Sequence, residues 1–98
     1  MNPAIYVRSQ RHEAPSQGHQ WELNDDEAIN LVTKNCSYCG DAPFEGCGSI
    51  DRVDNNRGYV RENCVPSCGY CNTMKGSLTK EKFLSQVEKI NAHQSLNG

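Results

Sequence analysis

The sequence predicts a small α+β domain in which a short polar hairpin is held by a metal staple and flanked by helices. Three observations predict it. Two Cys-x-x-Cys pairs, Cys36/Cys39 and Cys68/Cys71, bracket the central stretch, and the turn signal Asn55–Gly58 lies between them. Helical apolar periodicity precedes the first pair and follows the second.

The chain has 98 residues, enough for one domain, and 36% of them are apolar. A core this thin usually needs a staple, and a bound metal supplies one. Residues 1–20 contain two prolines together with glycine, serine and glutamine. We expect them to form an irregular or partly disordered N-terminal arm. Residues 21–98 are then the metal-bound domain.

The first helix is expected from Asn24 to about Asn35. Asn24 and Glu27 form an N-cap pair, and an apolar face follows them, against which Trp21 packs. Ser49–Asp54 is expected to be a short strand, and Tyr59–Val65 the return strand after the turn.

A short helix is expected over Gly69–Lys75, where the second cysteine pair begins it and Gly76 breaks it. Thr79 then caps a last helix near residues 80–93. Its apolar positions recur three or four apart and predict that this helix covers the metal core: Phe83, Leu84, Val87 and Ile90.

Six cysteines require a choice between metal and disulfides. An even number in a short chain is compatible with a secreted disulfide framework. Residues 1–20 contain no apolar stretch typical of a signal peptide, and no run is long enough to span a membrane. Paired spacing in a reducing compartment favours a structural zinc ion held by the two Cys-x-x-Cys pairs. Cys47 and Cys64 remain as small, buried or half-buried side chains, with Cys64 the alternative ligand.

The net charge of −2 is not that of a general nucleic-acid binder. Its distribution is uneven, because residues 1–50 carry three Lys/Arg against seven Asp/Glu, whereas residues 51–82 carry six against four. The mildly basic segment coincides with the cysteine-bracketed region, where phosphate contacts are needed.

A second constellation consists of Asp51, Asn63 and Asn72. The zinc staple fixes the helix that carries Asn72 against the strand that ends near Asp51, so the two side chains can converge. A carboxylate and an amide oxygen, completed by waters and a phosphate, suit Mg²⁺ or Mn²⁺. Each residue alone is better explained as a turn or cap residue, and it is the three together at this spacing that indicate a site.

These motifs resemble an HNH endonuclease of the zinc-bound ββα-metal (His-Me finger) class, especially its short phage-type and mobile-element members. The resemblance covers residues 36–76: Cys-x-x-Cys, Ile-Asp-Arg-Val-Asp-Asn, Gly-Tyr, Glu-Asn and Cys-x-x-Cys-Asn-x-x-Lys. It implies hydrolysis of DNA phosphodiesters to 5′ phosphate and 3′ hydroxyl. It further implies that Asp51 and Asn72 bind the catalytic ion, Asn63 holds the hairpin loop and Lys75 contacts phosphate.

The sequence departs from this family at Arg52, which replaces the usual general-base histidine. Arginine stays protonated and cannot accept a proton, although it can clamp a phosphate. Asp54 is a candidate base or additional ligand, or else a side-chain cap of the following turn. A water that the ion activates could also attack without a protein base, and His19 could reach the site from the N-terminal arm.

Backbone contacts to DNA are expected from Arg52, Arg57, Arg61 and Lys75. The preferred function is a metal-dependent DNA endonuclease in the cytoplasm of a phage-infected or bacterial cell, with a partner protein or DNA shape supplying specificity. A zinc-dependent nucleic-acid-binding module without catalysis is the main alternative, and a protein-interaction zinc domain the third.

Overall fold

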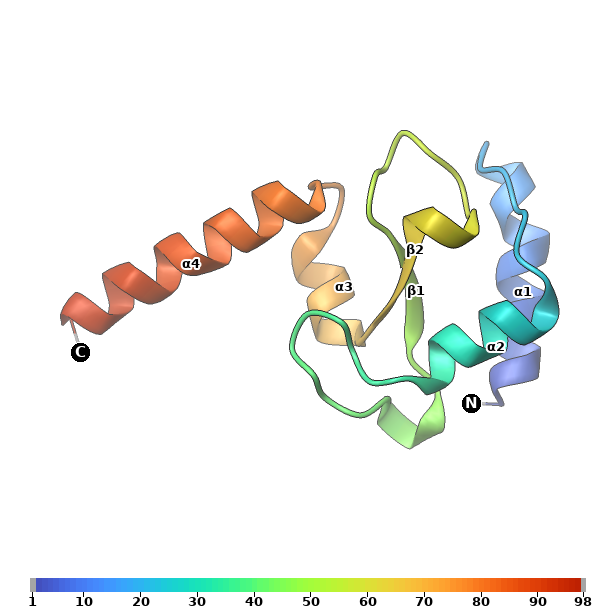
Figure 1. Cartoon of the computed structure of the whole chain (residues 1–98), viewed down its shortest axis with the longest axis horizontal. Coiled ribbons are helices and arrows are strands. Elements are labelled where there is room, and N and C mark those ends of the chain that lie inside the picture. Colours follow the sequence, from blue (N-terminus) through green and yellow to red (C-terminus); the bar gives the residue numbers. More distant parts are fainter. Residues whose placement is uncertain (1, 98) are drawn as a thin grey trace.

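The computed structural model describes residues 2–97 and has the predicted α+β architecture (Figure 1). A two-stranded sheet lies between helices, and one long helix extends from the body. The elements in chain order are α1 (Pro3–Ser16), α2 (Asp25–Thr33), the 3-10 turn η1 (Phe44–Gly46), β1 (Ser49–Arg52), the 3-10 turn η2 (Arg61–Asn63), β2 (Cys64–Ser67), α3 (Gly69–Lys75) and α4 (Lys80–Asn97).

The prediction of an irregular N-terminal arm is wrong for most of residues 1–20, because Pro3–Ser16 forms helix α1. Asn2 caps it through a 2.8 Å hydrogen bond from the Ala4 N–H, and Pro3 occupies a first-turn position that suits proline. Val7 and Ala14, two turns apart, are almost fully buried. Two buried side chains and an N-cap therefore stabilise a helix that the polar composition of this segment does not predict.

Helix α2 begins as the sequence predicts. Asn24 Oδ1 accepts from the Glu27 N–H at 2.8 Å, and Glu27 Oε1 accepts from the Asn24 N–H at 3.0 Å, which completes a capping box. The core joins α1, α2 and both strands. Its buried members are Val7, Leu23, Ala28, Val32, Ile50 and Cys64, and Trp21 is packed at its edge.

The two strands pair antiparallel, with Ser49 opposite Ser67 and Arg52 opposite Cys64. The return strand predicted at Tyr59–Val65 lies later, at Cys64–Ser67. Tyr59 instead pairs with the segment after α1, since its N–H donates to Gln20 O at 2.7 Å and its carbonyl accepts from the Glu22 N–H at 2.8 Å. The chain from the end of α1 thereby lies beside the loop that joins the strands.

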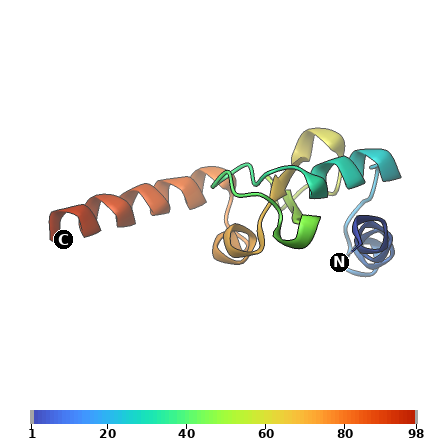
Figure 2. The ribbon, with the colours of Figure 1, turned by 90° about the horizontal axis from the view of Figure 1, so that it is seen from below.

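Helix α4 projects away from the body in both views (Figures 1 and 2), which explains the extents of 45 × 29 × 19 Å. Thr79 caps it as predicted, through the Lys82 N–H at 3.1 Å. The prediction that this helix covers the metal core holds only for its first turn, where Phe83 is buried and contacts Tyr38 edge-on at 5.4 Å. Leu84, Val87 and Ile90 are exposed.

Candidate metal centre and adjoining polar cavity

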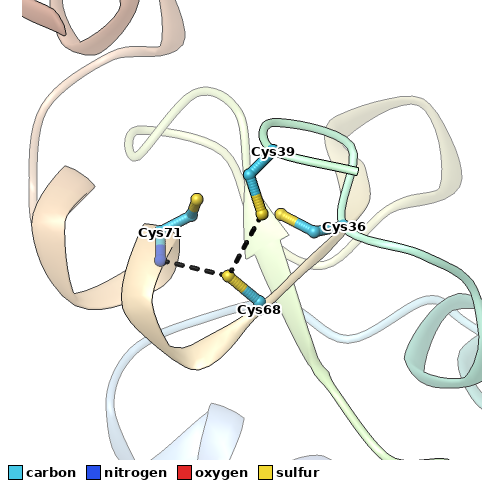
Figure 3. A group of neighbouring side chains, drawn as sticks. All are labelled: Cys36, Cys39, Cys68 and Cys71. Carbon is cyan, nitrogen blue, oxygen red and sulfur yellow. Dashed lines mark hydrogen bonds between the residues drawn. The ribbon is translucent and has the colours of Figure 1, made fainter. Parts of the chain in front are cut away.

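Four cysteines converge from two segments (Figure 3). Cys36 and Cys39 come from the loop after α2, whereas Cys68 and Cys71 lie at the start of α3. All four Sγ atoms lie within 4.8 Å of one another. A tetrahedral ion with Zn–S bonds of about 2.3 Å needs sulfur separations of about 3.8 Å, and Cys39 Sγ lies 3.7 Å from Cys68 Sγ. The predicted ligand set is therefore brought together in a cluster that could hold zinc.

Backbone N–H groups favour the thiolate at Cys36, whereas burial and then the neighbouring sulfurs raise the pKa of Cys71. Burial alone raises the pKa of the Cys36 thiol, but hydrogen bonds from three backbone N–H groups outweigh it and lower the pKa to about 6. Cys68 Sγ accepts from the Cys71 N–H at 3.3 Å as the N-cap of α3. Thiolates are the form that binds metal. Within residues 2–97, Cys47 and Cys64 lie outside the cluster, as predicted.

A second feature is a small polar cavity of about 140 Å³ beside β1. Both residues that were expected to converge line it, Asp51 from β1 and Asn72 from α3. Four separate segments contribute its lining residues, which are Tyr6, Gln10, Ile50, Asp51, Arg52, Asn55, Tyr59, Asn72 and Gly76. The cluster positions Asn72 directly, because this residue follows the cluster member Cys71 in α3.

Asp51 is buried and has two partners in the protein. Its Oδ2 accepts from the Tyr38 hydroxyl at 2.5 Å, and its Oδ1 lies 3.2 Å from Lys75 Nζ. Burial, and then this hydrogen bond to Asp51, raise the pKa of Tyr38, so its phenol remains a donor. A carboxylate offers about four lone-pair sites, and two partners leave room for further coordination.

Lys75 does not occupy the place that the sequence suggested. It is only 1% exposed, and Nζ donates to the Arg52 carbonyl at 3.2 Å besides its ion pair with Asp51. A phosphate on the surface cannot reach this ammonium. The predicted phosphate contact through Lys75 is therefore withdrawn, since the side chain instead joins α3 to β1.

Arg52 holds the loop between the strands. Its Nη1 donates to the carbonyls of Asn55 and Arg57, both at 3.0 Å, and its guanidinium lies 5.4 Å from the centroid of the Tyr59 ring. Nη2 lies 3.1 Å from His19 Nε2. Since arginine has no acceptor, His19 accepts this bond through an unprotonated Nε2. The Nε–H and one Nη2–H of Arg52 are left for a ligand.

Asn63 and Asp54 organise the same loop. The buried Asn63 side chain accepts from the Asp54 N–H at 2.9 Å and donates to the carbonyls of Asp54 and Gly58, each at 3.0 Å. Asp54 Oδ1 accepts from the Asn56 N–H at 2.9 Å. Asp54 thus caps the turn, one of its two predicted roles, and it does not line the cavity with Asp51.

The remaining predicted DNA contacts are exposed but paired. Arg57 lies 3.0 Å from Glu62, and Arg61 lies 2.6 Å from Glu27. His19 borders a different, larger cavity across the loop, not the one that Asp51 lines.

Sequence reasoning missed Tyr6, Gln10 and Tyr38. The first two lie on a helix that was expected to be irregular, one turn apart. The four-residue spacing of Tyr6 and Gln10, which places them on one face of a helix, is the one sequence feature that could have indicated them.

No protein-family model matches the chain. It is 39% identical over 71 residues to the uncharacterized protein R423 of Acanthamoeba polyphaga mimivirus, a match that covers 72% of this chain and 13% of that protein. The chain thus spans about an eighth of the length of this curated relative. Its fold is similar to that of PacI, a rare-cutting HNH restriction endonuclease, with a TM-score of 0.72, 18% identity and coverage of 94% of this chain and 78% of that one.

The predicted fold class is therefore confirmed: a small α+β domain with an HNH-like fold and a cysteine cluster that could bind zinc. No helix within residues 2–97 combines the length and the apolarity that a bilayer crossing requires.

Proposed function

We propose that this protein is a metal-dependent DNA endonuclease. The observation that carries the proposal is that Asp51 of β1 and Asn72 of α3 line one small polar cavity, in a fold similar to that of an HNH restriction endonuclease. Within residues 2–97 the Asn72 side chain makes no hydrogen bond, so its carbonyl oxygen is available to a ligand. A carboxylate and an amide oxygen suit Mg²⁺ or Mn²⁺ bound together with a substrate phosphate.

Two ions with different tasks are implied. Cys36, Cys39, Cys68 and Cys71 hold a structural zinc ion that fixes α3 against β1. Asp51 and Asn72 hold the catalytic ion, which when bound polarises the phosphodiester and stabilises the leaving 3′ oxygen. The chemistry of the donors supports both assignments, because sulfur ligands suit zinc and oxygen ligands suit magnesium.

The remaining residues support the site. Arg52 directs its unused Nε–H and Nη2–H groups to the phosphate, and Asn63 holds the loop that orients Arg52. Exposed Arg57 and Arg61 contact the DNA backbone by exchanging their carboxylate partners for phosphates. Among the described residues that line the cavity, Asp51 is the one carboxylate and histidine is absent. Neither Asp54 nor His19 lines this cavity, so a bound ion would supply the activation of the water.

The proposed substrate is double-stranded DNA, cut with weak intrinsic specificity or guided by a partner protein or by DNA shape. Because a thiolate cluster requires reduced cysteines, the proposal places the protein in the cytoplasm. Its similarity to a mimivirus protein supports a virus-infected host cell.

A plasmid-nicking assay tests the proposal. The zinc-loaded protein is incubated with supercoiled plasmid in Mg²⁺, in Mn²⁺ and in EDTA. Wild type is expected to nick plasmid with either ion and not in EDTA. The nicking rates of Asp51→Asn and Asn72→Ala should be lower by a factor of about 100 or more. Asp51→Asn keeps an oxygen for Tyr38 and so limits the structural disturbance. The matched controls are Asp26→Asn, an exposed carboxylate in the first turn of α2, and Asn30→Ala on its exposed face.

Equal nicking by all variants would identify a contaminating nuclease and refute the assignment. DNA binding without nicking in either ion would favour the alternative, a non-catalytic zinc-dependent nucleic-acid-binding module.

A further inference from the structure

Helix α1 forms one wall of the polar cavity. Tyr6 and Gln10 are one turn apart, so they lie on the same face of this helix, and both line the cavity that Asp51 and Asn72 border from the opposite elements. This helix precedes residues 36–76, in which the metal-binding motifs occur. Its contribution to the cavity therefore comes from outside the segment that carries those motifs.

The wall is fixed in place on several sides. Val7 and Ala14 are buried on the neighbouring face of α1, where Val7 belongs to the core shared with α2. The Arg11 guanidinium pairs with the Asp25 carboxylate at the start of α2. The segment after α1 hydrogen-bonds to Tyr59, which also lines the cavity. Tyr6 and Gln10 are thus presented by a rigid element.

Several of the polar side chains that line the cavity already have partners in the protein. Asp51 accepts from Tyr38 and pairs with Lys75. Both Nη1 hydrogens of Arg52 are used by loop carbonyls. The Asn55 amide donates to the carbonyls of Ser77 and Leu78. A phosphate that enters the cavity therefore meets two free charged donors, the Nε–H and one Nη2–H of Arg52, and neutral donors nearby would add to them.

Tyr6 and Gln10 can supply neutral donors. Burial and the neighbouring Tyr59 raise the pKa of Tyr6 to about 12, so its hydroxyl is protonated at neutral pH. A backbone hydrogen bond at Ile50 offsets part of this rise, and within residues 2–97 the Tyr6 hydroxyl donates to no acceptor. The Gln10 side chain makes no hydrogen bond within residues 2–97. A cavity of about 140 Å³ exceeds the roughly 30 Å³ that one water occupies in the liquid.

We propose that Tyr6 and Gln10 bind the phosphodiester in this cavity, by donating hydrogen bonds from the Tyr6 hydroxyl and the Gln10 amide to its non-bridging oxygens. The inference rests on the proposed function and adds a phosphate-binding wall to it. Both residues position the phosphate, and neither acts as a base or a nucleophile. Their contacts are present before and during the reaction, so they strengthen binding more than they raise kcat.

Binding in Ca²⁺, measured by fluorescence anisotropy with a labelled duplex, tests the inference without relying on cleavage. Tyr6→Phe and Gln10→Ala are each expected to raise Kd about tenfold, since a hydrogen bond to a charged group is lost. Tyr70→Phe and Gln86→Ala make the same chemical changes at exposed positions outside the cavity. They should leave Kd unchanged. Thermal melts of all four variants establish that they are folded.

In Mg²⁺, KM of the two cavity variants should rise by about the same factor as Kd, whereas kcat should change by less than about threefold. An unchanged Kd for both would overturn the inference, as would a loss confined to kcat. Wild type that binds DNA but does not cut would refute the proposed function alone, because the Kd comparison still decides the role of the wall. Wild type that does not bind DNA would overturn both.

Discussion

The hydroxyl of Tyr38 donates a 2.5 Å hydrogen bond to Asp51 Oδ2. Tyr38 lies between the two cysteines of the first pair, so this bond connects the cysteine cluster directly to the carboxylate of the polar cavity. Its ring contacts Phe83 of α4 as well. One residue therefore joins the candidate zinc site, the proposed catalytic ligand and the last helix.

Tyr38→Phe removes this hydrogen bond and keeps the ring contact with Phe83. We expect the free energy of unfolding to fall by about 1–2 kcal/mol, because a buried carboxylate oxygen loses its donor. Denaturant unfolding measures the change, and Tyr70→Phe, at a position that is 85% exposed, serves as the control. In a double-mutant cycle with Asp51→Asn, the two losses should not add. Full additivity would show that the bond has no energetic role.

Lys75→Met leaves Asp51 as a buried carboxylate without its cationic partner. The loss of one member of a buried ion pair costs about 3–5 kcal/mol of unfolding free energy. Chemical denaturation measures it, and Lys89→Met on the exposed part of α4 should change stability by less than about 0.5 kcal/mol. A Lys75→Met variant as stable as wild type would contradict the buried pair, and an accompanying Asp51→Asn change should recover part of the loss.

Removal of a cluster cysteine is expected to unfold the domain. Cys36→Ser and Cys71→Ser each break the four-sulfur cluster, and a metal bound there would supply much of the folding free energy of a chain this small. Zinc content by elemental analysis and circular-dichroism melts report the result. Cys47→Ser, a half-buried cysteine outside the cluster, should retain one zinc ion per chain and most of the stability. A melt unchanged by either cluster replacement would contradict a structural metal.

Gly58→Ala should be destabilising for a reason that its turn signal does not reveal. A Cβ at this position would lie 2.6 Å from the carbonyl oxygen of Gln20, whereas a Cβ on Gly69 meets nothing within 4 Å. We expect a cost of about 1–3 kcal/mol for Gly58→Ala. Gly69→Ala, the matched control, should be neutral or slightly stabilising, since alanine favours a helix. Equal stability of both variants would contradict the close approach of the two segments.

The two cysteines outside the cluster should react slowly with iodoacetamide. Burial raises the pKa of Cys64 to about 12 and also raises that of Cys47. Only the thiolate reacts with iodoacetamide. A cysteine with a raised pKa has a smaller thiolate fraction than an ordinary cysteine at the same pH. At about pH 8, mass spectrometry of the zinc-loaded protein should find Cys64 essentially unmodified, with modification increasing as the pH rises. Guanidinium with EDTA should expose all six thiols, and rapid labelling of folded Cys64 would contradict this environment.

The local parts of the fold could be predicted from sequence, because their signals lie within a few residues. The capping box of Asn24 and Glu27, the paired cysteines and the cap at Thr79 are of this kind. Asp51 and Asn72, which were predicted to converge from the two elements that the cysteine cluster adjoins, line the same cavity. The role of Asn63 as a loop clamp matches the hydrogen bonds that the structure gives it, although its effect on catalysis stays a prediction.

Tertiary relationships could not be predicted in this way. Helix α1 depends on burial of Val7 and Ala14 against distant elements, which polar composition conceals. Lys75 looks like a surface cation in the sequence, whereas its partners Asp51 and Arg52 lie far away along the chain. The start of β2 at Cys64 was missed because Tyr59 pairs with the segment around Gln20 instead of extending the hairpin.

The central claim is that Asp51 and Asn72 share one divalent ion in the polar cavity. Anomalous diffraction from zinc-loaded crystals soaked in Mn²⁺ tests it most directly, with data at the manganese edge. We predict a peak about 2.0–2.3 Å from an oxygen of each side chain, absent in Asn72→Ala crystals. Density for manganese at other sites alone, or an empty cavity at saturating Mn²⁺, would contradict the account.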